Sequence, residues 1–272
     1  MKTEKFFKIF FLYLIIFPFL SIDNLNAQDN VWNNKKCAVV LTYDDALNTH
    51  LDNVIPLLDS LNFKGTFYVF GLASGFRERL KDWAVAASKG HELGNHTLFH
   101  PCIGNLKGRE WVQPEYDLNT YSLKRIEDEI LMNNVLLEAV DGQKVRTFAY
   151  PCGDMKAGDS SYVDFIKNEF IAARGVNFLY QKIDEIDLFN IGCFVVNNQS
   201  GSDLIDLVKK AIAENALIVF LFHGVGGEHS INVSSEAHRQ LLKFLKENEK
   251  DIWVATLKDV AEFIIQHQSK TY

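Results

Sequence analysis

The feature that most constrains the fold is a repeated alternation of short β-rich runs with longer helical patterns. Apolar runs such as CAVVLTY (37–43), GTFYVF (65–70) and LIVFLF (217–222) are each followed by a segment with helical periodicity. These runs are almost continuously apolar, as strands are when helices cover both faces of a parallel sheet. We therefore expect an α/β fold, built from β/α units around a parallel sheet.

The same alternation continues to the end of the chain. Further strands are expected at 145–150, 190–196 and 252–256, and helices at 50–61, 76–90, 160–170, 202–215, 235–250 and 258–268. Thr256 and Asp259 have the spacing of a capping box, which places the start of the last helix here.

The first 27 residues have the layout of an export signal. Lys2, Lys5 and Lys8 precede an apolar run, Ile9 to Leu20, that is too short to span a bilayer, and a small-residue cleavage site ends at Ala27. An uncleaved membrane anchor is the alternative, although Pro18 interrupts the run. We expect residues 1–27 to be a signal peptide, an exported protein that is periplasmic or extracellular, and no stable membrane insertion after cleavage.

Charge and length limit the partners and the number of domains. Without its first 27 residues the chain has 25 basic and 33 acidic residues, a net charge of −8, which argues against a nucleic-acid or anionic-membrane partner. No linker or repeat interrupts the remaining residues, so we expect 28–272 to form a single catalytic domain. The sequence does not indicate an oligomeric state.

Four cysteines remain after cleavage, Cys37, Cys102, Cys152 and Cys193. In an exported protein they could pair in three ways. A domain of this size does not need disulfides to hold its core, so we expect free, buried thiols.

Polar clusters follow several of the expected strands. They are TYDD (42–45), HELGNHTLFHP (91–101), FAYPCG (148–153) and LFHG (221–224). Chemistry in α/β folds lies at the carboxyl ends of the strands, so these clusters are expected to converge on one rim.

His96 and His100 are four residues apart, a spacing that lets two imidazoles on one helical turn face a common point. A carboxylate from another strand end would complete a two-histidine, one-carboxylate zinc site with an open position, which is the catalytic arrangement. Surface histidines on a capped turn are the alternative. His91 lies within the expected strand and is interpreted as a hydrogen-bonded core residue.

Adjacent carboxylates such as Asp44 and Asp45 are most often turn or helix-cap residues. Beside a metal, one can ligate while its neighbour, pointing elsewhere, accepts a proton. His223 follows the buried run 218–222 and is either a core histidine or a general acid for a leaving amine.

The segment 102–122 has no clear period and contains Trp111, Tyr116 and Tyr121. Long loops in compact domains are usually functional or disordered, and the aromatic residues favour function. Trp111 is expected either to stack against a sugar or to pack as a lid over the mouth of the barrel.

Taken together, these residues resemble the motifs of the polysaccharide deacetylases of carbohydrate esterase family four, the NodB-like domains, over about residues 37–265. Thr42-Tyr43-Asp44-Asp45 is similar to their first motif, His96-Thr97-Leu98-Phe99-His100-Pro101 to the second, and Leu221-Phe222-His223 to the fifth.

The resemblance implies a distorted (β/α) barrel of about seven parallel strands and a divalent metal, usually zinc. It also implies that the enzyme, a hydrolase, removes N- or O-linked acetyl groups from an acetylated oligo- or polysaccharide. By the same match Asp44 is the catalytic base, His223 the acid, and Asp45, His96 and His100 the metal ligands. Leu221 lines the acetyl pocket, and we expect Tyr150 and Trp111 to line the substrate pocket.

The chain departs from the family pattern at two motifs. The third motif usually has an arginine, but here Ala149 stands at that position in FAYPCG; the backbone N–H of Cys152 can still serve the oxyanion. The fourth motif, which supplies an aspartate partner for the acid histidine, has no secure match, and Asp184 and Asp187 are candidates.

Arg174 is a candidate replacement for the missing arginine. It is expected near the end of the strand after Ala149, from where it could reach Asp44, favour its ionised form and orient it. A surface ion pair with Asp164 or Glu169 is the alternative.

Two other functions remain open from the sequence. They are a hydrolase of the same fold that acts on a small non-sugar amide, and a glycan-binding homologue that has lost catalysis.

Overall fold

The computed structural model describes residues 31–269. The expected signal peptide therefore lies outside the described residues, as does the expected cleavage site. Within 31–269, no helix is long and apolar enough to cross a membrane.

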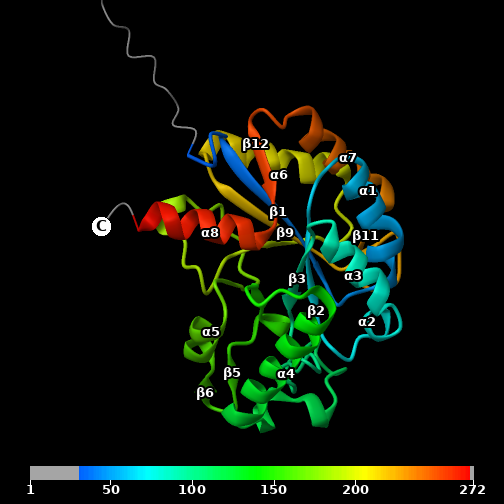
Figure 1. Cartoon of the computed structure of the whole chain (residues 1–272), viewed down its shortest axis with the longest axis vertical. Coiled ribbons are helices and arrows are strands. Elements are labelled where there is room, and N and C mark those ends of the chain that lie inside the picture. Colours follow the sequence, from blue (N-terminus) through cyan, green and yellow to red (C-terminus); the bar gives the residue numbers. More distant parts are fainter. Residues whose placement is uncertain (1–30, 270–272) are drawn as a thin grey trace, which may run out of the picture.

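The centre of the fold is a sheet in which all the paired strands run parallel (Figure 1). Its order is β7-β4-β3-β2-β1-β9-β8, and β12 additionally pairs with the first half of β1. The strands are β1 (Cys37–Asp44), β2 (Thr66–Val69), β3 (Glu92–Asn95), β4 (Phe148–Ala149), β7 (Ala173–Arg174), β8 (Phe194–Val195), β9 (Leu217–Phe222) and β12 (Ile252–Ala255). The seven strands of this order curl into a half-barrel, with β12 as an eighth strand beside β1, which confirms the expected α/β class and distorted barrel.

Two further strand pairs are short and lie off the main sheet. Lys156–Ala157 (β5) and Ser160–Ser161 (β6) pair antiparallel, and Gly224–Val225 (β10) and Asn232–Val233 (β11) pair parallel. The second pair closes the base of the loop that follows β9.

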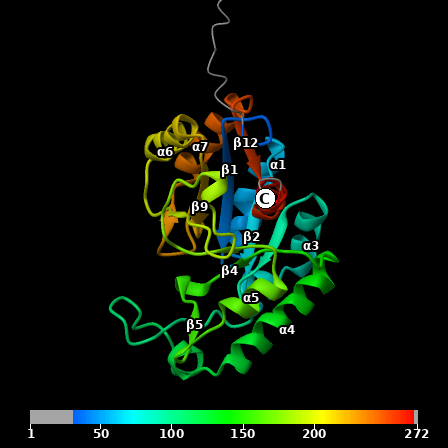
Figure 2. The same ribbon diagram turned by 90° about the vertical axis from the view of Figure 1, so that its left-hand side faces the viewer.

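Helices surround the sheet (Figures 1 and 2). They are α1 (Ile55–Ser60), α2 (Ser74–Arg77), α3 (Leu80–Ser88), α4 (Leu123–Asp141), α5 (Val163–Glu169), α6 (Gly201–Glu214), α7 (Ser235–Glu247) and α8 (Leu257–Gln268). Shorter helical turns are η1 (His50–Val54), η2 (Pro114–Tyr116), η3 (Leu118–Thr120), η4 (Pro151–Gly153) and η5 (Ile183–Glu185).

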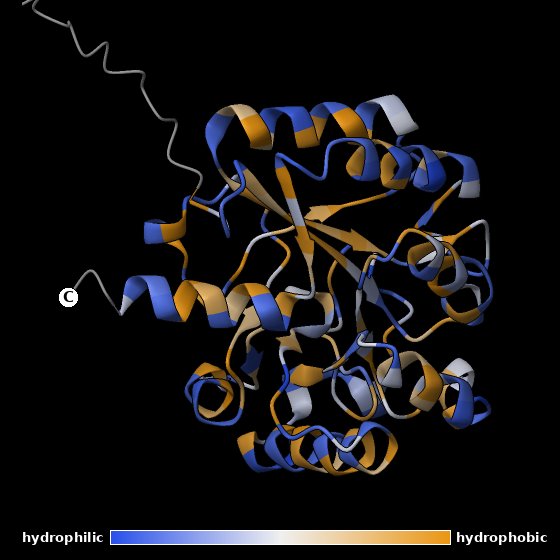
Figure 3. Ribbon diagram, turned by 45° about the horizontal axis from the view of Figure 1, so that its top comes forward, coloured by the Kyte–Doolittle hydropathy of each residue, from blue (hydrophilic) through white to orange (hydrophobic). Residues whose placement is uncertain are grey.

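The core lies between the sheet and the helices, as Figure 3 shows by the apolar strands inside amphipathic helices. Every residue of β1 and of β9 is buried. On α6, for example, Leu204, Val208 and Ala211 face this core while the opposite side is solvated. Burying a side chain such as Leu204 stabilises the fold by roughly 1.5–3 kcal/mol.

The expected elements are present, but several are shorter or divided. The strand expected at 145–150 is reduced to β4 because Pro151 lacks an N–H and begins a turn. Helix 50–61 is divided into η1 and α1, and helix 76–90 into α2 and α3. Thr256 caps α8 by accepting the N–H of Asp259, as its spacing predicted.

Candidate functional site

A cavity of about 1090 Å³ opens at the carboxyl ends of the strands. Its lining includes groups from all four polar clusters that the sequence placed on one rim, among them Asp44, His96, Cys152 and His223. The convergence of these clusters is confirmed.

Asp44 is the last residue of β1, and its side chain is buried against Arg174 from β7. Arg174 Nη2 donates to Asp44 Oδ2 at 2.5 Å, and the guanidinium is fully buried, with its carbon 5.0 Å from the centre of the Tyr68 ring. Although burial lowers the pKa of Arg174, Asp44 and other neighbours raise it above its ordinary value, so the guanidinium stays charged. The expected contact between Arg174 and Asp44 is therefore present, although three strands separate β7 from β1, and the surface pairing with Asp164 or Glu169 is wrong.

Asp45 points away from Arg174 because its backbone has a φ of 78°, in the left-handed region. Its Oδ1 lies 3.8 Å from His96 Nε2 and 3.6 Å from His100 Nε2. Its Oδ2 lies 3.8 Å from His223 Nε2 and 4.0 Å from His229 Nε2. Burial would raise the pKa of the Asp45 carboxyl, but the surrounding imidazoles lower it below its ordinary value.

The turn that carries His96 and His100 is not helical, so the expectation of one helical turn is wrong. Thr97 and His100 have φ values of 66° and 55°. The turn is held by two side chains, because Asn95 Oδ1 accepts the N–H of Thr97 and Thr97 Oγ1 accepts the N–H of His100. The two imidazoles still meet, with ring centres 4.7 Å apart.

Each imidazole presents its Nε2 to the same point. His96 Nδ1 lies 2.7 Å from the carbonyl oxygen of Ala149, so this nitrogen carries the proton and Nε2 keeps its lone pair. His100 has a weaker partner, since its Nδ1 lies 3.8 Å from Cys102 Sγ. Burial, followed by the nearby His100, lowers the pKa of His96 far below its ordinary value, which keeps this ring neutral.

The three groups fit a divalent cation. Their ligand atoms lie within 4.8 Å of one another, and Asp45 Oδ1 is buried without a hydrogen-bond partner in the described part of the chain. Ligand atoms around a tetrahedral zinc are roughly 3.4 Å apart, given bonds of about 2.0–2.1 Å. The observed separations of 3.6 and 3.8 Å need little adjustment to reach that value.

His223 follows β9 directly and faces Asp45 from the opposite side of the cavity. Burial lowers the pKa of His223. His50 Nε2 lies 2.8 Å from the carbonyl oxygen of His223 and so holds its backbone in place. The His229 ring stacks on the His223 ring at 4.6 Å and 13°.

His229 was missed by the sequence argument. The available signal was GVGGEHS, a glycine-rich segment that ends in a histidine six residues after His223. β10 and β11 fold this segment back over the cavity.

The expected partners of His223 are not observed. Asp184 lies 3.1 Å from His267 Nε2, and Asp187 accepts the N–H of Phe189. Neither has a contact with His223, and both lie in the segment between β7 and β8, where η5 packs against α8. The carboxylate nearest to the His223 ring is Asp45.

Cys152 lies in the turn after β4 with a φ of 56°, and it lines the cavity together with Tyr150 and Leu221. Its sulfur is bonded to Cys102, so the expectation of four free thiols is wrong for this pair. Cys37 and Cys193 are free and buried, as expected. Sequence spacing could not reveal the bond, because the two loops approach only when β3 and β4 pair.

The segment 102–122 contains the short helical turns η2 and η3. Arg109 ties it to the turn after β4, since Nη1 contacts Asp154 at 2.5 Å and Nη2 donates to the carbonyl of Cys152 at 3.0 Å. Trp111 lines the cavity with its ring centre 6.4 Å from that of His100, and it is 55% exposed. His91, by contrast, is a buried core residue bonded to Gly65 and Asp59, as interpreted.

The carboxyl ends of the curled parallel sheet thus bring together a buried aspartate–arginine pair and a set of two histidines and one carboxylate. The sequence profile described as "Polysaccharide deacetylase" matches residues 32–162. This match confirms the resemblance to that family drawn from the motifs.

Solved structures share the fold at low sequence identity. A Mycobacterium smegmatis protein described as a polysaccharide deacetylase is 15% identical with a TM-score of 0.58, covering 86% of this chain and 92% of that one. Bacillus subtilis PdaA, a family 4 carbohydrate esterase, is 16% identical with a TM-score of 0.53, over 86% and 82%. A mutant of the peptidoglycan deacetylase PdaC from Bacillus subtilis is 17% identical with a TM-score of 0.51, over 88% and 96%.

Two curated proteins match in sequence. A gellan lyase from Bacillus sp. is 24% identical over 270 residues, which are 90% of this chain and 10% of the lyase. The uncharacterized protein YlxY of Bacillus subtilis is 27% identical over 109 residues, which are 40% of this chain and 29% of YlxY. The chain therefore spans only a minor part of either protein.

Proposed function

We propose that the protein is an exported, metal-dependent deacetylase that removes N- or O-linked acetyl groups from a carbohydrate. The observation that carries the proposal is the division of labour between two adjacent aspartates. Asp44 Oδ2 accepts a hydrogen bond from Arg174 and lies 3.9 Å from His96 Nε2, whereas Asp45 lies within 3.8 Å of both His96 and His100 and its Oδ1 has no hydrogen-bond partner among the described residues.

The site residues divide the chemistry as follows. Asp44, oriented by Arg174, accepts the proton of the attacking water. The backbone N–H of Cys152 donates to the acetyl oxygen as negative charge develops there. His223 protonates the leaving amine or alkoxide, and Leu221 packs against the acetyl methyl group.

Asp45, His96 and His100 would hold the cation, and this donor set suits Zn²⁺. When bound, the ion supplies Lewis-acid polarisation of the acetyl carbonyl and lowers the pKa of water.

The side chains that line the cavity favour a saccharide of low charge as the substrate. Its lining combines Trp111 and other apolar side chains with the acids Asp44, Asp45 and Glu228, and none of its described lining residues is lysine or arginine. A sugar ring has an apolar face that can stack on an aromatic ring such as Trp111. We therefore favour neutral acetylated glycans of the N-acetylglucosamine or xylan type.

The decisive experiment measures acetate release from acetylated chitin, peptidoglycan and xylan oligomers, with and without a chelator. Chelator-sensitive release from at least one glycan supports the proposal. Release only from small acetylated amines indicates a non-sugar amidase, and binding without release indicates a glycan-binding homologue. The Asp44→Asn protein is the matched control for contaminating esterases.

Export rests on the sequence of residues 1–27. Expression in a bacterial host with an export pathway, followed by mass spectrometry of the exported protein, tests it. We expect a mature N-terminus at Gln28, and a chain that keeps residues 1–27 in the membrane fraction would support the anchor instead.

A further inference from the structure

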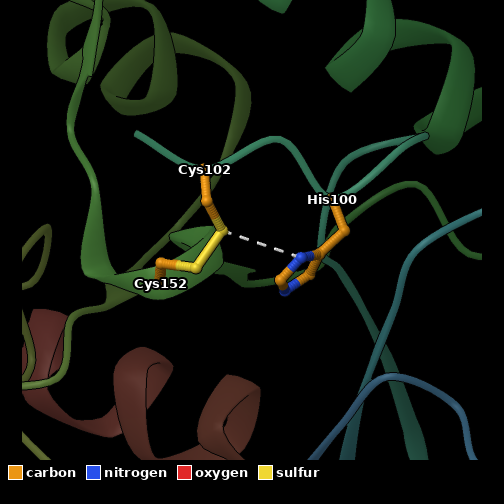
Figure 4. A group of neighbouring side chains, drawn as sticks. All are labelled: His100, Cys102 and Cys152. Atoms are coloured by element: carbon orange, nitrogen blue, oxygen red, sulfur yellow. Dashed lines mark hydrogen bonds between the residues drawn. A yellow bond between two sulfur atoms is a disulfide. The ribbon is translucent and has the colours of Figure 1, made fainter. Parts of the chain in front are cut away.

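The disulfide between Cys102 and Cys152 lies against one of the candidate metal ligands (Figure 4). Cys102 Sγ is 3.8 Å from His100 Nδ1, and the side-chain donor atoms of these three residues all lie within 4.8 Å of one another. Cys102 is fully buried, and Cys152 lines the cavity. A histidine and two sulfurs therefore form a second group that could hold a cation, with both sulfurs blocked by their bond.

His100 belongs to both groups through different nitrogens. Its Nε2 faces Asp45 at 3.6 Å, and its Nδ1 faces Cys102. A neutral imidazole has one protonated nitrogen and one lone pair, so it can ligate through only one of the two at a time. The two groups cannot both use His100.

We propose that Cys102, Cys152 and His100 form a redox-controlled cation site that competes with the Asp45–His96–His100 set. When the disulfide is intact, its sulfur is only a weak acceptor for His100 Nδ1–H, and Nε2 is left to the Asp45 set. When the disulfide is reduced, the two thiolates and His100 Nδ1 bind Zn²⁺ or another thiophilic divalent cation. This inference rests on the proposed function only for its effect on acetate release.

Reduction of the disulfide consumes one phosphine and one water molecule. A trialkylphosphine attacks one sulfur, the S–S bond breaks, and water then converts the phosphorus to its oxide, which leaves two thiols. Each thiol loses its proton when the cation binds.

The other two cysteines serve as an internal control. Cys37 begins β1, at the end of the strand opposite Asp44, and burial raises the pKa of its thiol to about 12. Cys193 is buried against Arg174 and Gly175. Both remain in a Cys102→Ala/Cys152→Ala variant, so any thiolate signal from them would persist there.

The test uses cobalt as a spectroscopic probe. Metal-free wild type, oxidised or reduced with phosphine and then desalted without oxygen, is titrated with Co²⁺, and the double variant receives the same treatment. We expect sulfur-to-cobalt charge-transfer absorption, saturating near one equivalent, in the reduced wild type alone. Equal spectra for reduced and oxidised wild type, or the same absorption in the double variant, would overturn the proposal.

A second measurement follows the competition for His100. The zinc-loaded wild type should lose on the order of ten-fold or more in acetate release after reduction, while the double variant, whatever its basal rate, should have the same rate before and after phosphine treatment. Equal inhibition of both proteins would refute the competition. If the oxidised wild type releases no acetate from any glycan, the proposed function fails, but the cobalt spectra still decide the cation site.

Discussion

The two halves of the site are built differently. In the sheet half, Asp44, His96 and Arg174 lie on strands or directly after them, and each is at most 3% exposed. Their contacts are short, with 2.5 Å between Arg174 and Asp44 and 2.7 Å between His96 and Ala149. In the loop half, the side chains of His100 and His229 are 18% and 30% exposed.

The contacts of the loop half are also longer and weaker than those of the sheet half. They are a sulfur at 3.8 Å from His100 and a ring stack between His223 and His229. Proton transfer requires a base in a fixed position, whereas a loop can adjust to the substrate. The comparison suggests that the sheet half determines the rate of the reaction. The loop half would determine the redox conditions under which the reaction proceeds and the substrate that is accepted.

The largest effect should come from removing the ligands. His96→Ala and His100→Ala should each lower zinc affinity by more than about 100-fold, as measured by metal content after dialysis. This loss is larger than the one expected when only a residue that hydrogen-bonds to a metal ligand is changed. Only His96→Ala leaves a buried carbonyl, that of Ala149, without its donor, at a cost of about 1–3 kcal/mol.

The melting temperature of the metal-free proteins separates the halves. It should fall by about 3–8 °C for His96→Ala and barely change for His100→Ala. Equal losses of melting temperature in the two variants would contradict the difference between the sheet half and the loop half. Unchanged metal content in either variant would show that its histidine is not a metal ligand.

The two aspartates test whether base and ligand are distinct. Asp44→Asn should keep zinc and lose on the order of 100-fold or more in kcat, because the amide cannot accept the proton. Asp45→Asn should instead lose zinc. Parallel loss of metal in both variants would contradict the assignment.

Arg174→Leu should act through the base without touching the metal. We expect bound zinc and a loss of about 10-fold in kcat/KM, because Asp44 loses the guanidinium that holds it in one orientation. Arg174→Lys, which keeps the charge but not the planar fork, should recover only part of the rate. An unchanged kcat/KM in the Leu variant would mean that Arg174 only packs.

His229 should have a smaller effect that depends on its ring. His229→Phe keeps the stack on His223 and should stay within about 2-fold of wild type in kcat, whereas His229→Ala should lose about 5-fold, in line with a stacking contact worth roughly 1 kcal/mol. If Phe and Ala behave alike, the nitrogen of His229, not its ring, is what matters.

Trp111 should affect substrate binding alone. Trp111→Ala should raise KM about 3-fold or more, with kcat and zinc content unchanged, because a stacking surface binds substrate and transition state equally. Trp111→Phe is the matched control. A fall in kcat at constant KM would show that Trp111 contributes to the chemical step, which would contradict the assignment of substrate binding alone to this residue.

The sheet half could be predicted from the sequence far better than the loop half. Strand ends at Asp44 and Arg174 follow from local patterns, and the curl of the sheet then brings the two side chains together although β4, β3 and β2 separate their strands. The turn at 96–100 could not be predicted, because its left-handed residues depend on bonds from Asn95 and Thr97. The disulfide and the position of His229 depend on how loops approach each other, which no local pattern encodes.

The pairing of β12 with the first half of β1 has a consequence for the biogenesis of the protein. Cys37 to Val40 gain a neighbour on that side only from Ile252–Ala255, more than 200 positions later in the sequence. Until synthesis has passed that point, the apolar stretch from Cys37 to Val40 has an open edge, the kind of surface on which chains aggregate. Stalled or C-terminally truncated chains should therefore be substrates for chaperones and proteases, whatever the state of their catalytic residues.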